Sequence, residues 1–187
     1  REEVLACGQE NARVGGLKYA DLNGDGRINA DDQTWIFNPV PDFSWGLNVS
    51  LNYKDFDLSL FFRGAFGFDI FNIHDFYYGT RNFTGNRLKK AYAKNFVVSS
   101  TANPVVCDYF LERGDYLKLD MVTLGYTLKP ENCRFIERIR LYGTMKNVFT
   151  LTKFSGVDPS TYQVNGLTPG GQGSRTYFPS TRQFILG

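Results

Sequence analysis

A strict alternation of apolar and polar residues through residues 43–62 is the clearest pattern in the chain. From Phe43 to Tyr53 every odd position is apolar or aromatic, and every even position is Ser, Gly or Asn. A period of two predicts a β-strand. The apolar beat resumes at Phe56 after Lys54 and Asp55, so the two strands are predicted to form a β-hairpin.

Three more strands are predicted downstream, at residues 115–128, 139–154 and 181–187. The alternation in the first of them slips once near Asp120 and Met121, which predicts a β-bulge there. The connections alternate between short and long: two residues, about fifty, about ten and about twenty-six. Outer-membrane barrels show this alternation, with short periplasmic turns and long outer loops. It therefore favours an antiparallel transmembrane β-barrel over the soluble β-sandwich that the hairpin alone favours.

Aromatic residues stand at both ends of the first strand, with aliphatic residues between them. Phe43 and Trp45 lie at one end, and Tyr53 and Phe56 lie at the other. A tilted strand of this length spans roughly 25 Å, the height of the apolar band of an outer-membrane barrel. In a barrel, the residues expected to face lipid are Phe43, Trp45, Leu47, Val49, Leu51, Leu58 and Leu60. Those expected to face the lumen are Asn48, Ser50, Asp57 and Ser59.

Composition and charge exclude several classes of function. The net charge of +2 argues against a surface that binds polyanions. Aromatic residues make up 16% of the 187 residues, which suits strands, membrane girdles or sugar-stacking surfaces. The sequence has no run of 18 apolar residues, so no transmembrane helix is predicted. The chain starts without Met at Arg1 and stops as a strand begins, so we expect it to be cut at both ends.

Neither the cysteines nor the single histidine suggest a catalytic or metal centre. Cys7, Cys107 and Cys133 are far apart without metal-like spacing, although one pair could form a disulfide in an oxidising compartment. His74 lies beside Asp75, but no second histidine or cysteine is near. No nucleophile elbow is present. We expect no catalytic residues, and hence no enzyme.

Residues 21–32, DLNGDGRINADD, have the spacing of a calcium-binding loop, with Asp in place of the usual final Glu. The neighbouring sequence does not predict the helices of an EF-hand, and the alternative is a polar turn without metal. The shorter final carboxylate suggests weak, structural binding of Ca²⁺. The candidate ligands are Asp21, Asn23, Asp25, Arg27 through its carbonyl, Asn29 and Asp32.

The connection at residues 64–114 is long and rich in Phe, Tyr, Asn and Gly. Loops of this length are usually functional or disordered. Its aromatic cluster suits stacking on sugar rings or peptide side chains, and the alternative is that these rings pack on one another. The candidates for contact with a ligand or a lid are Phe76, Tyr77, Tyr78, Arg81 and Phe83.

Several motifs, in order and spacing, resemble the SusC/RagA-type TonB-dependent outer-membrane transporters over most of residues 16–187. They are YADLNGDGRINADD at 19–32, NP at 38–39, PDF at 41–43, Gly46, YK at 53–54, FDLS at 56–59, FF at 61–62, DYL at 115–117, TLGYTL at 123–128, NVFT at 147–150 and DP at 158–159.

This resemblance implies about five C-terminal strands of a 22-stranded barrel in the bacterial outer membrane, with the plug and the TonB box elsewhere in the protein. It implies import of oligosaccharides or oligopeptides, together with a SusD-like surface lipoprotein and the TonB-ExbB-ExbD system. The 64–114 loop is short for such a transporter.

The implied domain plan places residues 1–42 in an extracellular loop that carries the calcium-like motif. Residues 43–187 form barrel strands with extracellular loops at 64–114 and 155–180. The alternative function is a secreted, calcium-stabilised β-sandwich that binds carbohydrate.

Overall fold

The computed structural model describes residues 9, 16–79, 85–92, 106–130, 137–162 and 180–187. The chain divides into two compact units. One comprises Arg1–Phe37, Phe71–Leu111 and Gln172–Arg175, and the other comprises Asn38–Ile70, Glu112–Gly171 and Thr176–Gly187. No helix within the described ranges is long and apolar enough to cross a lipid bilayer.

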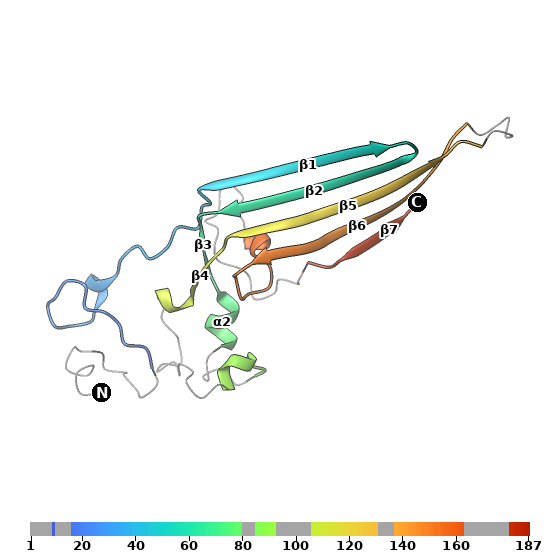
Figure 1. Cartoon of the computed structure of the whole chain (residues 1–187). Coiled ribbons are helices and arrows are strands. Elements are labelled where there is room, and N and C mark those ends of the chain that lie inside the picture. The colour runs from blue at the N-terminus through green and yellow to red at the C-terminus, as the bar shows by residue number, and fades with distance from the viewer. Residues whose placement is uncertain (1–8, 10–15, 80–84, 93–105, 131–136, 163–179) are drawn as a thin grey trace. The chain divides into compact units, whose positions relative to one another are not determined.

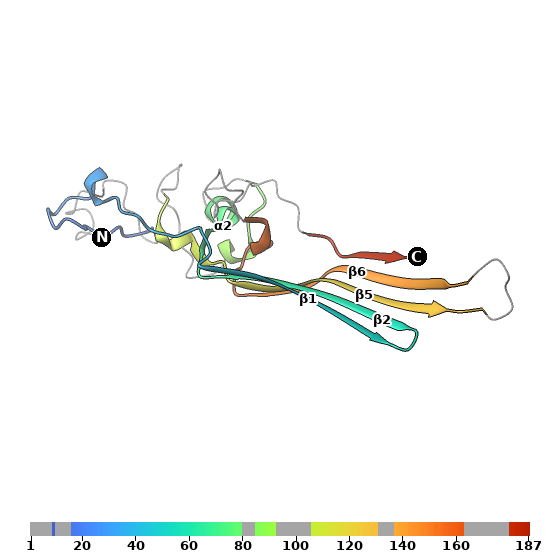
Figure 2. The same ribbon diagram turned by 90° about the horizontal axis from the view of Figure 1, so that it is seen from above.

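The second unit contains an antiparallel five-stranded sheet with the strand order β1-β2-β5-β6-β7. Figure 1 shows the four long strands side by side, and Figure 2 shows β1 and β2 running at an angle to β6, as in a twisted sheet. The predicted antiparallel all-β fold is confirmed. The strands are β1 (Phe43–Tyr53), β2 (Phe56–Phe66), β5 (Tyr116–Leu128), β6 (Ile139–Thr152) and β7 (Gln183–Leu186).

The predicted hairpin is present, and β1 has the predicted bounds. Its register runs without a break from Phe43 opposite Phe66 to Tyr53 opposite Phe56. Lys54 closes the two-residue turn with a φ of 53°. The second strand continues to Phe66, beyond its predicted end, because Gly64 interrupts the apolar pattern without ending the pairing. Its missing side chain leaves room for Trp45, whose Nε1 would lie 2.6 Å from a Cβ at position 64.

The predicted bulge in β5 is also present. Phe61 pairs with Met121 and Phe62 pairs with Leu119, so Asp120 has no partner on β2. The pairing of β5 with β6 shifts at the same level, between Leu119 and Met121.

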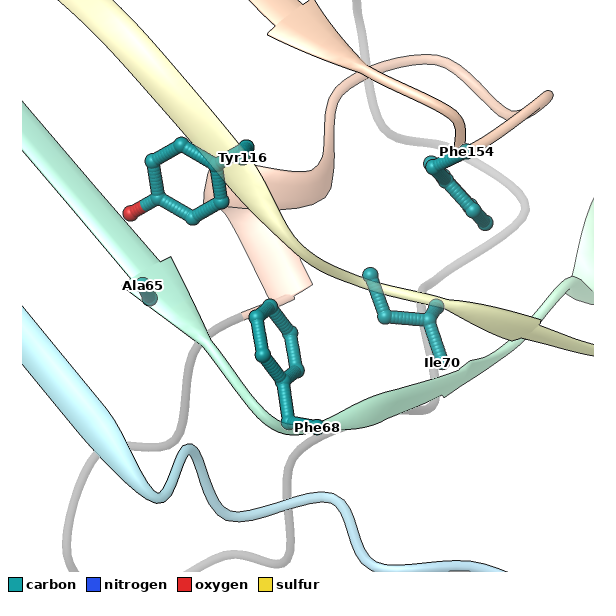
Figure 3. Packing of buried hydrophobic residues seen from close by; sticks show 5 residues of the cluster. All are labelled: Ala65, Phe68, Ile70, Tyr116 and Phe154. Atoms are coloured by element: carbon teal, nitrogen blue, oxygen red, sulfur yellow. The ribbon is translucent and has the colours of Figure 1, made fainter.

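A small apolar cluster closes one end of the sheet. Ala65 and Tyr116 are register partners at the ends of β2 and β5. They pack with Phe68, Ile70 and Phe154 from the adjoining connections, and all five side chains are buried (Figure 3). The residues that directly follow β2 and β6 therefore pack against this end of the sheet.

The other unit is built mainly from short helical segments. Its core consists of Phe71, Phe76 and Phe110, with Leu17 and Tyr77 among the half-buried residues around them. The short elements of the chain are η1 (Ala30–Asp32), β3 (Asp69–Phe71), α2 (Ile73–Tyr78), η2 (Lys89–Tyr92), η3 (Asp108–Phe110), β4 (Leu111–Arg113) and η4 (Pro159–Tyr162), with β3 and β4 paired as a two-stranded sheet.

Candidate functional site

On one face of the five-stranded sheet, every strand carries apolar or aromatic side chains. The exceptions are two glycines, Gly64 on β2 and Gly143 on β6. Residues directly opposite each other in the register share a face, so the odd positions of β1 select this set across the sheet. Beyond the odd positions of β1 it comprises Phe56, Leu58, Leu60, Phe62, Gly64, Phe66, Leu117, Leu119, Val122, Leu124, Tyr126, Leu128, Ile139, Leu141, Gly143, Met145, Phe149, Leu151, Phe184 and Leu186. We refer to it as the apolar face.

The apolar face lies open along its length. Leu47 is 50%, Leu124 53% and Leu141 54% exposed, although they belong to three different strands. Soluble proteins rarely expose a contiguous apolar surface of this extent. A β-sandwich would cover it with a second sheet, but the only other sheet among the described residues has two strands of three residues. The exposed apolar face fits a surface that contacts lipid.

The opposite face, which we refer to as the polar face, carries Ser, Asn, Thr and charged residues at the alternate positions. Asp57 on β2 accepts two hydrogen bonds from Arg140 on β6, at 2.9 and 2.5 Å, across the intervening strand β5. This contact is possible because Gly125 on β5 has no side chain; a Cβ there would meet the Asp57 carboxylate. Thr123 and Thr144 share a 2.8 Å hydrogen bond beside it. A polar face opposite an apolar one is the pattern of a barrel wall around an aqueous lumen.

A buried ion pair holds the start of the β6–β7 connection against the polar face. Lys118 of β5 is 2% exposed, and its Nζ lies 3.1 Å from Oδ2 of Asp158. Ser160 donates its backbone N–H and its hydroxyl to Oδ1 of Asp158, and Ser180 donates its hydroxyl to Oδ2. Asp158 therefore anchors η4 and the segment before β7 to the same lysine.

The hydrogen bonds around Asp158 keep its carboxylate ionised. Burial alone would raise its pKa, but the bonds from Ser180, Ser160 and Lys118 outweigh burial and hold the pKa below its ordinary value. The stabilisation from this carboxylate is present above the ordinary pKa and is lost as the pH falls through the lower value of the folded state.

A hollow of about 440 Å³ lies on the polar face next to this ion pair. Its charged lining residues are Arg63, Lys118, Asp120 and Lys146. The Arg63 Nε lies 2.6 Å from Oδ2 of Asp120, and Nζ of Lys118 lies 3.9 Å from the other Asp120 oxygen. The remaining lining residues are Phe61, Met121, Asn147, Ser180, Thr181 and Gln183.

The calcium-like segment folds as a loop whose carboxylates cap its own backbone. Asp21 accepts N–H bonds from Gly24 and Gly26 at 2.7 and 2.8 Å. Asp32 accepts N–H bonds from Leu22 and Asn29, both at 2.8 Å, and such bonds hold its pKa below the ordinary value. Asn23, Asp25 and Asn29 each accept from the residue two positions on, which for Asp25 is the N–H of Arg27.

A calcium ion needs six or more oxygen ligands gathered around one point. Among the described residues there is no group of three or more His, Cys, Asp or Glu side chains that could hold a metal ion. The bonds present are those of a self-capped turn, which is the alternative considered from the sequence. Calcium binding at Asp21, Asn23, Asp25, Arg27, Asn29 and Asp32 stays a prediction.

The predicted aromatic contacts divide between core and half-buried positions. Phe76 is 6% exposed and packs edge-on against Phe110, with ring centroids 5.1 Å apart, so its ring forms part of a core. Tyr77 is half-buried against the same cluster. The half-buried Tyr78 has its ring 6.2 Å from that of His74. Arg81 and Phe83 lie outside the described residues, and ligand contact by this set stays a prediction.

Cys107 is a free thiol whose pKa is raised by burial, which keeps it protonated near neutral pH. Cys7 and Cys133 lie outside the described residues.

The sequence did not predict the Lys118–Asp158 pair or the hollow. In the sequence, Lys118 is one of several polar residues in an alternating strand. Asp158 lies 40 residues further along the chain, so no local spacing links the two. The one available signal was the strand slip at Asp120, because bulges often turn a side chain toward a functional surface.

Comparison with curated proteins gives matches to TonB-dependent receptors. The chain is 30% identical to TonB-dependent receptor P3 of Formosa agariphila, over 92% of the chain and 18% of the receptor. It is 29% identical to receptor P26 of the same organism, over 100% of the chain and 21% of the receptor. It is 26% identical to TonB-dependent receptor SusC of Bacteroides thetaiotaomicron, over 95% of the chain and 18% of the receptor. The chain thus spans about a fifth of the length of these relatives, and no family model matches it.

Comparison with solved structures shows that this chain shares its fold with part of the RagAB peptide importer. The RagAB peptide importer in its closed-closed state superposes with a TM-score of 0.66 at 20% identity, covering 91% of this chain and 20% of the importer chain. In its open-open state the TM-score is 0.64 at 21% identity, covering 90% of this chain and 19% of the importer chain. The five-stranded sheet therefore has the fold of part of the RagAB barrel, in agreement with the fold that the sequence motifs implied.

Proposed function

Because the chain is related over most of its length to SusC/RagA-type TonB-dependent receptors, we propose that it forms part of an outer-membrane nutrient importer. The observation that carries this proposal is the apolar face, which extends over five strands and has leucines about half exposed on β1, β5 and β6. Buried in a bilayer, such a face supplies the stability that a soluble fold obtains from a closed core. The polar face then lines the lumen.

The chemistry of this segment is binding and passage rather than catalysis. The relatives are named as receptors, not as enzymes. We propose that the energy comes from the TonB-ExbB-ExbD system, engaged by a part of the protein outside this segment. A SusD-like surface lipoprotein is the proposed lid.

The proposed cargo is an oligosaccharide or an oligopeptide. The resemblance to SusC-type transporters motivates the first alternative, and the similarity in fold to RagAB, a peptide importer, motivates the second. The proposed ligand contacts are the half-buried Tyr77 and Tyr78, whose rings could stack on either kind of cargo.

The proposed topology follows from loop length. The short connections, Lys54-Asp55 and residues 129–138, are placed in the periplasm, and residues 1–42, 64–114 and 155–180 are placed outside the cell. A cysteine introduced at Gly85, in a variant whose own three cysteines are replaced by Ser, should react with an impermeant maleimide on intact cells. Reaction only after rupture of the outer membrane would refute this orientation.

Growth of a host strain on single polysaccharides and peptides, with and without the intact transporter, tests the import function. Loss of growth on one class of nutrient is expected, together with the same loss when TonB is removed. Identical growth on every nutrient, or uptake that persists without TonB, would refute the proposal.

A further inference from the structure

Every shift in strand pairing within the described sheet occurs beside the hollow on the polar face. The pairings of β1 with β2 and of β6 with β7 are regular, whereas both pairings of β5 shift next to Asp120. On β6 the irregularity includes Asn147, which adopts a left-handed φ of 56°. Asp120 and Asn147 both line the hollow. Bulges commonly redirect side chains beside binding sites. The irregular pairing at Asp120 and Asn147 therefore makes the hollow a candidate binding site.

Among the described charges around the hollow, one cation has no ion-pair partner. Arg63 pairs with Asp120, and Lys118 pairs with Asp158. Lys146 also lines the hollow, is exposed, and forms no ion pair with any residue that the structure describes. Of the three cations that line the hollow, Lys146 is therefore the one that no described carboxylate pairs with.

The rest of the lining suits a small amphipathic group. Phe61 and Met121 supply apolar surface, and Asn147, Ser180 and Gln183 supply amide and hydroxyl groups. A volume of about 440 Å³ lies within the range of small-molecule sites. One cation without a described partner suits a monoanion, and the guanidinium in the lining is already paired with an aspartate, so a carboxylate fits better than a doubly charged phosphate.

We propose that this hollow is a lumenal subsite for a carboxylate-bearing group of the cargo, with Lys146 as its charge partner. The carboxylate belongs either to an acidic sugar or to a peptide. This assignment rests on the proposed function only in that the polar face lines the lumen. Asn147 and Gln183 hydrogen bond to the neutral part of the same group, while Asp120 stays occupied by Arg63 and the Ser180 hydroxyl by Asp158.

Two matched pairs of probes test the assignment on the purified full-length transporter in detergent. D-Glucuronate is compared with D-glucose, and N-acetylalanine is compared with its amide, by saturation-transfer NMR. The proteins are the unaltered chain, Lys146→Met, and the control Lys153→Met, which removes an exposed lysine outside the hollow.

The unaltered protein should prefer at least one carboxylate probe over its neutral partner by about threefold to fivefold, as for a single exposed ion pair. Lys146→Met should abolish this preference, and Lys153→Met should retain it. The preferred pair of probes identifies the sugar or the peptide as the source of the carboxylate.

Absence of any preference in the unaltered protein would overturn the subsite, and so would a preference that survives Lys146→Met. A third overturning result is a loss of thermal stability in Lys146→Met with no carboxylate preference, which would mean that an acidic residue elsewhere in the transporter occupies the lysine. Import measured on the same strains is independent, so failure of the subsite is distinguishable from failure of the importer.

Discussion

Replacing Asp158 by Asn should release the start of the β6–β7 connection from the sheet. The change keeps the shape of the side chain but removes the charge that Nζ of Lys118 meets at 3.1 Å. Lys118 is 2% exposed, so water can reach its ammonium group in place of Asp158 only if the connection opens locally.

The expected cost follows from these contacts. Removing one partner of a buried ion pair costs about 3–5 kcal/mol. Asp120, whose carboxylate lies 3.9 Å from Nζ of Lys118, still offsets part of the charge that the substitution leaves unpaired. The cost should therefore lie at the lower end of this range, about 3 kcal/mol. That value corresponds to a roughly hundredfold increase in the population of the opened segment.

Hydrogen exchange of the full-length protein in detergent measures this opening at the backbone N–H of Ser160. This N–H donates a hydrogen bond to Oδ1 of Asp158, with an N–O distance of 2.9 Å. The double variant Lys118→Met with Asp158→Asn removes both charges and should exchange more slowly than Asp158→Asn alone. The control Asp57→Asn breaks an exposed pair with Arg140 and should leave Ser160 unchanged.

Protection at Ser160, corrected for intrinsic exchange, should stay constant from neutral pH down to about pH 5. It should fall only below the ordinary carboxyl value of 3.8, because the pKa of Asp158 is lowered in the folded protein. Exchange in Asp158→Asn equal to that of the unaltered protein would refute the anchoring role of the pair. So would a double variant as fast as the single one.

Three further predictions concern the lipid face, the calcium-like loop and the aromatic loop. Arg at Val49, on the apolar face, should cost roughly 2–4 kcal/mol in urea unfolding of the membrane-inserted transporter, against little at Asn48; equal losses would mean that the two faces have been misassigned. Calorimetric titration with CaCl2 should give a dissociation constant of roughly 10⁻⁴ to 10⁻³ M that Asp21→Asn weakens at least tenfold, and no heat would leave residues 21–32 as a turn without metal. Replacing both Tyr77 and Tyr78 by Ala should reduce uptake several-fold, whereas unchanged uptake and lid association would make this loop scaffold.

The alternation of side chains was enough to predict the sheet. The bounds of β1 and the slip at Asp120 follow from the period of two, because successive side chains of a strand point to opposite faces of the sheet. The extension of β2 to Phe66 was missed because Gly64 supplies no apolar side chain and Trp45 fills its place. The apolar pattern of a single strand cannot predict where the strand ends when the side chain of a neighbouring strand covers a glycine.

The contacts that shape the polar face depend on residues far apart in sequence. Lys118 and Asp158 meet only after β5 and β6 have paired, and Asp57 reaches Arg140 only because Gly125 lies between them. In the other unit, Phe71, Phe76 and Phe110 form a core across a long connection that has no periodic pattern. No spacing in the sequence encodes these encounters, since they arise from register and chain reversal.

The alternation of lipid and water along β1 is the central claim, and spin labels placed one at a time at residues 47–51 of the full-length transporter in lipid bilayers test it most directly. Electron paramagnetic resonance with oxygen and with a nickel chelate reports contact with lipid and with water at each position. Labels at Leu47, Val49 and Leu51 should be relaxed mainly by oxygen, and labels at Asn48 and Ser50 mainly by the chelate. Equal accessibility to both reagents at all five positions, or the opposite phase, would contradict the assignment of this sheet to a barrel wall.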